Sequence, residues 1–173
     1  MTGFIKPKTH VMLDLETLDT QPSAVILAIG AVKFDKDEVL LGQSLLLFPE
    51  WEGTVACSTM EWWSKQAPES KNQMFNSTKR PLAECLAEVK DFCGDLPVWG
   101  NGSDFDNAIV NHRCKALGLT PLPYRNTRCF RTVKNLFDST AWTKPGIAHN
   151  PLSDAVAQAV TLINLAKRFN IPL

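Results

Sequence analysis

The first 48 residues alternate apolar runs with short polar breaks. Apolar runs cover residues 9–17, 24–34 and 38–48. The second run is continuous and of strand length, which is typical of a strand covered on both faces. A charged segment at 34–38 lies between the second and third runs and predicts a hairpin turn. The pattern therefore predicts three strands in a meander.

The rest of the chain mixes helical periodicity with short apolar runs. This order of elements favours a mixed α/β domain over a simple parallel sheet. Residues 67–80 are polar, and the sequence leaves a loop and a short helix open there. The other predicted elements are helices from residue 58, over 81–92, over 103–118, near 134–138 and from 150 onward, and strands over 97–100 and within 125–133.

Capping signals accompany three of the predicted helices. Ser58 and Glu61 have the spacing of a capping box, and Ser103 could cap the helix that follows it. Asn150 is a good N-cap, and Pro151 stands where a first-turn proline belongs. We therefore expect helices to begin at each of these positions.

Length and charge narrow the class of protein. The chain has 173 residues, without an internal repeat or a low-complexity linker, and we expect residues 1–173 to form one domain. Lys and Arg together number 18, and so do Asp and Glu, which gives a formal net charge of zero. This balance lacks the basic footprint of a tight duplex binder. It does not exclude a nuclease, since bound metal ions would add local positive charge.

Nothing in the sequence indicates a membrane or an export route. The N-terminus lacks the basic and apolar regions of a secretory signal, and the longest apolar stretch, residues 38–48, is too short to cross a bilayer. The five cysteines are widely spread, without a C-x-x-C pair, which predicts reduced core thiols. We expect a cytoplasmic protein that has no membrane partner.

Four acidic residues in three separate segments are the main chemical signal. They are Asp14, Glu16, Asp106 and Asp154, and His149 lies close before the last of them. Like charges at short range resist joint ionisation, so a fold that gathers carboxylates usually does so around hard cations. Asp14 and Glu16 are two apart, so a strand would present both on one face.

Each of these signals has a plainer explanation when it is considered alone. A D-x-E at a strand end is often a solvated edge. Asp106 and Asp154 could compensate a helix dipole, and an isolated histidine is commonly a surface or packing residue. Asp104 competes with Asp106, although the two would lie on different sides of a helix. The joint order of the motifs carries more weight than any one of them.

The order D-x-E, D and H-x-x-x-x-D resembles the DEDDh branch of the DnaQ-like exonucleases. DLET, VILAIGAV, T-x-x-W-W-x-x-Q and HNPLSDAVAQA look most like a small phage and bacterial branch of that family, which includes Rv-type exoribonuclease-like domains. The resemblance implies a ribonuclease-H-like fold, with a mixed five-stranded sheet flanked by helices on both sides. In the family the aspartate of the second motif follows an aromatic residue, and Phe105-Asp106 fits that.

The resemblance also implies roles for the site residues. Asp14, Glu16, Asp106 and Asp154 would hold two divalent cations, Mg²⁺ or Mn²⁺. Glu16 would also act in catalysis, and His149 would be the general base. Such a pair of ions would clamp the attacking and leaving oxygens of an in-line displacement.

Candidate substrate contacts are less specific. Thr17 and Leu18 match family positions that meet the terminal nucleotide, although plain loop residues are an equal alternative. Trp62 and Trp63 could stack on a base, while burial is as good an explanation for one of them. Arg131 belongs to a series of basic residues that recur at three-residue steps. These residues could contact successive phosphates or form a solvated face. The candidates are Thr17, Leu18, Trp62, Trp63, Asn101, Phe105 and Arg131.

Together with these residues, the resemblance implies a metal-dependent 3′→5′ exonuclease acting on single-stranded or frayed 3′ ends, with DNA preferred. An exoribonuclease that uses the same site is the enzymatic alternative. A module that binds ends without cutting them is the alternative from another class, and the complete set of four acids and a histidine argues against it. The sequence leaves open whether the protein forms a homodimer.

Overall fold

The computed structural model describes residues 9–102, 104–143, 146 and 148–173. Its centre is one mixed five-stranded sheet with the order β3-β2-β1-β4-β5. Strand β2 runs antiparallel to β1 and β3, while β4 runs parallel to β1 and β5 runs parallel to β4. This confirms the predicted fold class. The strands are β1 (His10–Thr17), β2 (Ile26–Phe34), β3 (Val39–Leu47), β4 (Val98–Gly100) and β5 (Thr127–Cys129).

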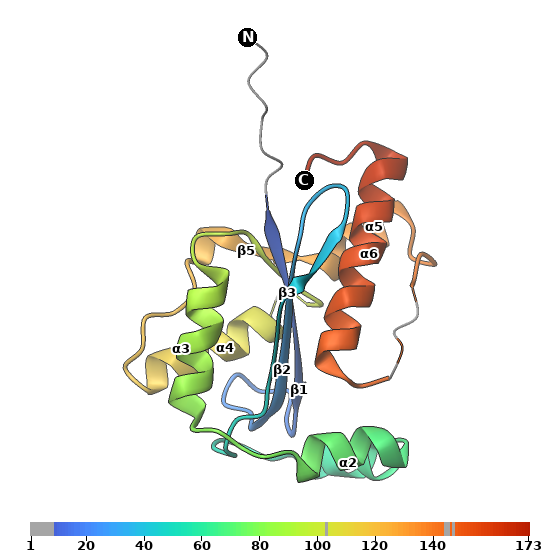
Figure 1. The fold of residues 1–173 in the computed structure, drawn as a ribbon. Helices are drawn as coiled ribbons and strands as arrows, with labels where there is room; N and C mark the ends of the chain where they lie inside the picture. The colour runs from blue at the N-terminus through green and yellow to red at the C-terminus, as the bar shows by residue number, and fades with distance from the viewer. Residues whose placement is uncertain (1–8, 103, 144–145, 147) are drawn as a thin grey trace.

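Helices cover both faces of this sheet. Figure 1 shows α3 and α4 on one side, α6 on the other, and α2 beside one end of the strands. A short 3₁₀ turn, η1 (Tyr124–Asn126), precedes β5. The helices are α1 (Cys57–Ser64), α2 (Pro68–Asn76), α3 (Leu82–Cys93), α4 (Asp106–Ala116), α5 (Phe130–Phe137) and α6 (Pro151–Phe169).

Alternation along β1 separates its packing side chains from its acids. Val11, Leu13 and Leu15 lie in the core cluster that includes residues of α3 and α4. Met12 packs instead in the cluster formed with α6. Because side chains alternate along a strand, Asp14 and Glu16 share the face of Met12 and point to the side of α6.

A glycine allows α6 to approach the sheet. Gly30 of β2 pairs with Asp14 of β1. A Cβ atom on Gly30 would lie 2.1 Å from the carbonyl carbon of Pro151 and 2.2 Å from the nitrogen of Leu152. Only a residue without a side chain leaves room for that backbone. The start of α6, which carries Asp154, therefore sits directly above the paired strands.

The capping predictions have mixed outcomes. Asn150 caps α6 as predicted, since its side-chain oxygen accepts a hydrogen bond from the Ser153 N–H at 2.8 Å. The capping box at Ser58 is wrong: α1 begins at Cys57 and its N-cap is Ala56, without a side-chain cap. The Ala56 N–H bonds to the Leu18 carbonyl, so contact with another segment sets this helix start. Ser103 lies outside the described residues.

Three other sequence expectations are refined. The polar segment 67–80 contains the nine-residue helix α2. The helix expected near 134–138 begins earlier, at Phe130, directly after β5. Of the five free cysteines, Cys85, Cys93 and Cys114 are buried as predicted, whereas Cys57 is exposed. Among the described residues, no helix is long and apolar enough to span a membrane.

Candidate active site

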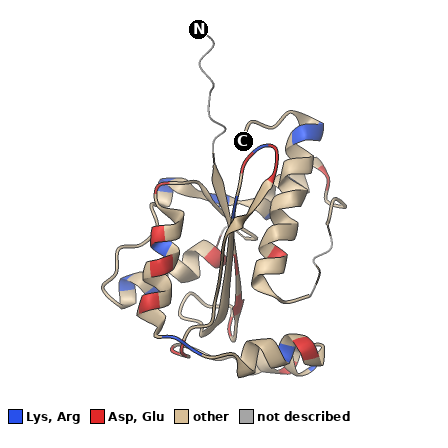
Figure 2. Cartoon of the chain, in the orientation of Figure 1, with Lys and Arg blue, Asp and Glu red and all other residues tan. Residues whose placement is uncertain are grey.

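The predicted acids come from three elements that meet near the carboxyl end of β1. Asp14 and Glu16 lie on β1, Asp106 is the first residue of α4, and Asp154 lies in the first turn of α6. Asp14, Glu16 and Asp106 are buried, and Asp154 is half-buried. Figure 2 shows acidic segments on the central strands and on the facing part of α6.

Main-chain groups fix the carboxylate of Asp106. Its Oδ1 accepts a hydrogen bond from the Leu15 N–H at 3.1 Å, and its Oδ2 accepts one from the Asn101 N–H at 2.7 Å. A Cβ atom on Gly100 would lie 2.9 Å from that Oδ2, so this glycine makes room for the acid. The carboxylate therefore joins the ends of β1 and β4. Asp104, the alternative in the sequence, is exposed.

A glutamine that the sequence analysis did not single out completes the acidic cluster. Gln158 is 1% exposed, and its Nε2 donates a hydrogen bond to Asp14 Oδ1 at 2.7 Å. It lies four residues after Asp154, so both side chains lie on the same face of α6. A buried polar residue at that spacing from a predicted ligand was the available signal.

Burial and mutual repulsion oppose ionisation of the two acids on β1. Burial, followed by the charges of Asp106, Glu16 and Asp154, raises the pKa of Asp14 well above its usual range, and the bond from Gln158 opposes this. Burial, followed by the charges of Asp154 and Asp106, raises the pKa of Glu16 to about 8. A metal-free site therefore retains protons near neutral pH.

The pKa values of Asp106 and Asp154 are raised less than that of Glu16. Burial raises the pKa of Asp106 to about 6, against the hydrogen bonds from the Asn101 and Leu15 N–H groups. Burial also raises the pKa of Asp154 to about 6, against a hydrogen bond from the backbone of His149. Cations would relieve the repulsion and favour the charged forms of all four acids.

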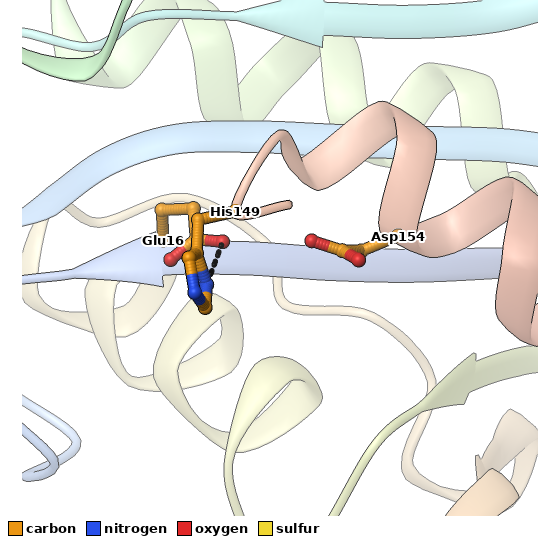
Figure 3. Close-up of side chains that lie close together, drawn as sticks. All are labelled: Glu16, His149 and Asp154. Atoms are coloured by element: carbon orange, nitrogen blue, oxygen red, sulfur yellow. Dashed lines mark ion pairs between the residues drawn. The ribbon is translucent and has the colours of Figure 1, made fainter. Parts of the chain in front are cut away.

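His149 lies at the rim of the cluster. Its Nδ1 is 3.9 Å from Glu16 Oε1, and its side chain is 33% exposed. Figure 3 shows the Asp154 carboxylate pointing from α6 toward Glu16 and His149. Partial burial lowers the pKa of His149. Its backbone adopts φ 58°, the left-handed region that a residue with a side chain rarely occupies.

The arrangement suits a divalent cation. Glu16, His149 and Asp154 each offer a ligand atom, and these atoms all lie within 4.8 Å of one another. Among the described residues, Asp14 and Asp106 are outside this group, but their charges act on Glu16 or on each other. Oxygen-rich donor sets favour Mg²⁺ and Mn²⁺. At these distances the imidazole of His149 can act either as a ligand or as a base.

A pocket of about 370 Å³ opens beside Glu16. Two of its walls are aromatic: Trp62 of α1, which is 42% exposed, and Phe105 just before α4. The remaining lining is rich in hydroxyl groups and comes from β1, the following loop and α1. Its lining residues are Leu15, Glu16, Thr17, Thr20, Ser58, Thr59, Trp62 and Phe105.

The other candidate contacts lie in different environments. Leu18 and Trp63 are 3% and 1% exposed and pack in one core cluster, so neither presents a surface to a base in this structure. Trp63 donates its indole N–H to the Thr17 carbonyl and so holds a residue that lines the pocket. Asn101 acts through its N–H on Asp106. Arg131 is exposed, lies near Gly102 and lowers the pKa of Asp106.

Comparison with known proteins gives a family match over most of the chain. Residues 9–165 match the family model of the Rv2179c-like domain, described as a 3′-5′ exoribonuclease domain. No curated protein matches the sequence. The matched segment includes all four acids and His149.

Solved structures share the fold at low sequence identity. E. coli exonuclease I, in a zinc-bound complex with single-stranded DNA, superposes with a TM-score of 0.69 and 13% identity over 94% of this chain. The nuclease domain of 3′hExo, a DEDDh family member bound to rAMP, gives 0.63 and 11% over 97% of this chain and 95% of its own. The cell-death related nuclease CRN-4 gives 0.54 and 12% over 93%. The chain spans 41% of the exonuclease I chain and 64% of CRN-4.

Proposed function

The chain belongs to the family of Rv2179c-like 3′-5′ exoribonuclease domains and is a 3′→5′ exonuclease domain; we propose that it acts with divalent cations on single-stranded or frayed 3′ ends and releases nucleoside monophosphates. We take residues 1–173 as one catalytic domain. One observation carries the proposal: Asp14, Glu16, Asp106 and Asp154 converge beside a pocket with aromatic walls, and His149 lies at the rim of this acidic cluster.

The four acids are the proposed cation ligands. Their raised pKa values indicate a cluster that is unfavourable without positive charge, and this supports binding of two ions, Mg²⁺ or Mn²⁺. Such cations would neutralise the phosphodiester and acidify a water molecule. Asp106, held by two N–H groups, and Asp14, held by Gln158, have oriented oxygens before any ion binds.

His149 is the proposed general base. Its lowered pKa keeps the imidazole neutral at physiological pH, which a proton acceptor requires. It would take the proton of the attacking water at a ring nitrogen. The Glu16 carboxylate, 3.9 Å from Nδ1, would stabilise the resulting imidazolium. The water oxygen bonds to phosphorus, and the bond from phosphorus to the 3′ oxygen of the preceding nucleotide breaks.

The pocket beside Glu16 is the proposed site of the terminal nucleoside. Trp62 and Phe105 offer rings to a base, and Thr17 lines the pocket next to Glu16 in the chain. Arg131 lies near Asp106 and would contact a phosphate, which its charge supports. An unpaired end fits such a pocket because stacking on protein rings replaces stacking on a neighbouring base.

RNA becomes the preferred substrate once the family is considered, in place of the DNA preferred from sequence. The matched family is described as exoribonuclease, and the pocket has four hydroxyl side chains able to meet a ribose 2′-hydroxyl. DNA stays the second candidate because E. coli exonuclease I, which shares the fold, was solved with single-stranded DNA.

A gel time course with matched 5′-labelled RNA and DNA oligonucleotides tests the proposal. Each is incubated with Mn²⁺, with Mg²⁺ and with chelator, and a 3′-phosphorylated oligonucleotide tests the need for a free end. We expect a descending ladder from the free 3′ end that chelator abolishes, with faster loss of RNA. The Asp14→Asn variant, purified in parallel, controls for contaminating nucleases.

Two outcomes would contradict this proposal. Cleavage that persists in chelator would remove the cations from the mechanism. A gel shift without cleavage of either strand would instead indicate a module that binds ends. Faster loss of DNA would reverse the substrate preference and leave the nuclease assignment unchanged.

A further inference from the structure

Helix α2 forms hydrogen bonds with the chain on both sides of His149, and α1 contacts the histidine ring. Immediately before the histidine, the Ala148 carbonyl accepts a hydrogen bond from Ser70 Oγ at 2.7 Å. Immediately after it, the Asn150 Nδ2 donates to Gln73 Oε1 at 2.9 Å. Ser70 and Gln73 are three residues apart on α2, so both face the histidine segment.

Asn150 links this contact to the start of α6. Its side-chain oxygen caps the helix through the Ser153 N–H, while its amide nitrogen is bonded to Gln73. Asn150 is buried and Gln73 is half-buried, so both bonds are partly shielded from water. A single side chain therefore ties α2 to the helix that carries Asp154.

The rings of α1 contact the imidazole itself. His149 and Trp62 meet edge to face with centroids 4.7 Å apart, and Trp63 lies 6.0 Å away. Trp63 is anchored to β1 by its bond to the Thr17 carbonyl. The side chain of His149 is thus held between α1 and Glu16, while α2 fixes the main chain on either side.

This support explains how His149 keeps its backbone conformation. A φ of 58° is unfavourable for a residue with a side chain and persists only where surrounding contacts impose it. The bonds at Ala148 and Asn150 are such contacts. They set the direction in which the imidazole leaves the chain, and hence its approach to Glu16.

We propose that Ser70 and Gln73 are positioning residues for the general base, acting through the main chain on either side of His149. The inference rests on the proposed function, because it concerns the alignment of His149 during hydrolysis. A base displaced by a fraction of an ångström transfers a proton poorly, even when substrate and cations are bound normally. Neither residue lines the pocket beside Glu16.

The test compares Ser70→Ala, Gln73→Ala and the double variant with the parent domain. We expect kcat to fall about tenfold in each single variant and about a hundredfold in the double variant. The KM for oligonucleotide and the half-saturating Mn²⁺ concentration should stay within about twofold, because a positioning defect acts on the transition state and not on binding. Gln73→Glu, which keeps the acceptor oxygen, should retain most of the turnover.

Two variants serve as matched controls. Ser64→Ala removes an exposed hydroxyl that donates to the Glu61 carbonyl of the same helix, and Asn72→Ala removes an exposed side chain next to Gln73. Both should leave kcat unchanged. NMR of the His149 ring protons gives a readout of position in the folded protein. Loss of the Trp62 contact should move these resonances in the Ser70 and Gln73 variants and leave them in place in the controls.

The outcomes separate this inference from the proposed function. Parent-like kcat and histidine resonances in the double variant, alongside a severe loss in His149→Ala, would overturn the positioning role and leave the base assignment intact. Full turnover in His149→Ala would overturn both. A fall in kcat shared equally by Asn72→Ala would also argue against positioning, since the side chain of Asn72 bonds to Asn76 of α2 and, among the described residues, makes no hydrogen bond to the histidine segment.

Discussion

The two sides of the active site are built by different means. Asp14 and Asp106 are buried and receive hydrogen bonds from Gln158 and from main-chain N–H groups at the strand ends. His149 is partly exposed and depends on side chains of α1 and α2, which lie outside the sheet. Asp14 and Asp106 are thus held by elements of the core, whereas His149 is held by contacts with helices outside the sheet.

This difference suits the two tasks. Ligands for a pair of cations must keep fixed separations, and the main chain of a sheet provides them. A base must reach water that arrives with the substrate, so a position at the rim serves it better. The acids should therefore be intolerant of change in both binding and turnover, while changes around the histidine should affect turnover alone.

Substitution of Asp14 should have the largest effect. Asp14→Asn keeps the shape and the bond from Gln158 but removes a ligand charge, and we expect turnover to fall at least about a thousandfold. The metal-free protein should melt no lower than the parent at neutral pH, because one of four repelling charges is gone. Gel assays and thermal melts measure both. Asp104→Asn, an exposed acid of the same segment as Asp106, is the control and should retain parent activity.

Removal of the histidine should have the next largest effect on turnover. His149→Ala should lower turnover about a hundredfold to ten-thousandfold and leave Mn²⁺ affinity close to that of the parent, because a base acts on the proton and not on the ion. Isothermal titration with Mn²⁺ and single-turnover assays separate the two quantities. Weakened Mn²⁺ binding would identify His149 as a ligand, as its distance to Glu16 and Asp154 also allows.

A change at Gly30 tests whether the acidic side depends on close contact between α6 and the sheet. Gly30→Ala would push Pro151 and Leu152 outward, and we expect a loss of about 1–3 kcal/mol in the free energy of unfolding. Turnover should fall as well, because Asp154 moves with α6. Urea unfolding measures the first effect. The matched control is Gly42→Ala, where a Cβ atom meets nothing within 4 Å.

The smallest predicted effect is a pH dependence of stability in the metal-free protein. The folded-state pKa values of Glu16, Asp106 and Asp154 lie above their ordinary values, so the folded state binds more protons than the unfolded state. Stability is then greatest below the unfolded pKa values and falls as pH rises through about 6 to about 8.

Thermal melts at pH 5.5 and pH 8 measure this. We expect the metal-free protein to melt at least about 3 °C lower at pH 8, and Mn²⁺ to raise the melting temperature more at pH 8 than at pH 5.5. The Asp14→Asn variant should show a weaker dependence. An equal Mn²⁺ effect at both pH values would mean that the ions do not bind the charged carboxylates.

Local pattern was enough to place most elements. The apolar runs and helical periods predicted the strands of the meander and the helices over 81–92 and from Asn150, because these segments follow the periods of their structures. The start of α1 was attributed to the wrong residue, since a bond from Ala56 to Leu18, 38 positions earlier, sets it. Capping by a distant segment leaves no local signal.

The sequence by itself determined the chemical types at the candidate site: the D-x-E pair on one face of β1, an acid at the start of α4, and a histidine before α6. Only the tertiary structure decided which neighbours orient them. Gln158 reaches Asp14 across 144 positions, and Ser70 reaches Ala148 across 78. Spacing along one element determines which residues share its face, whereas contacts between elements depend on packing, such as the approach of α6 to Gly30, that no single segment encodes.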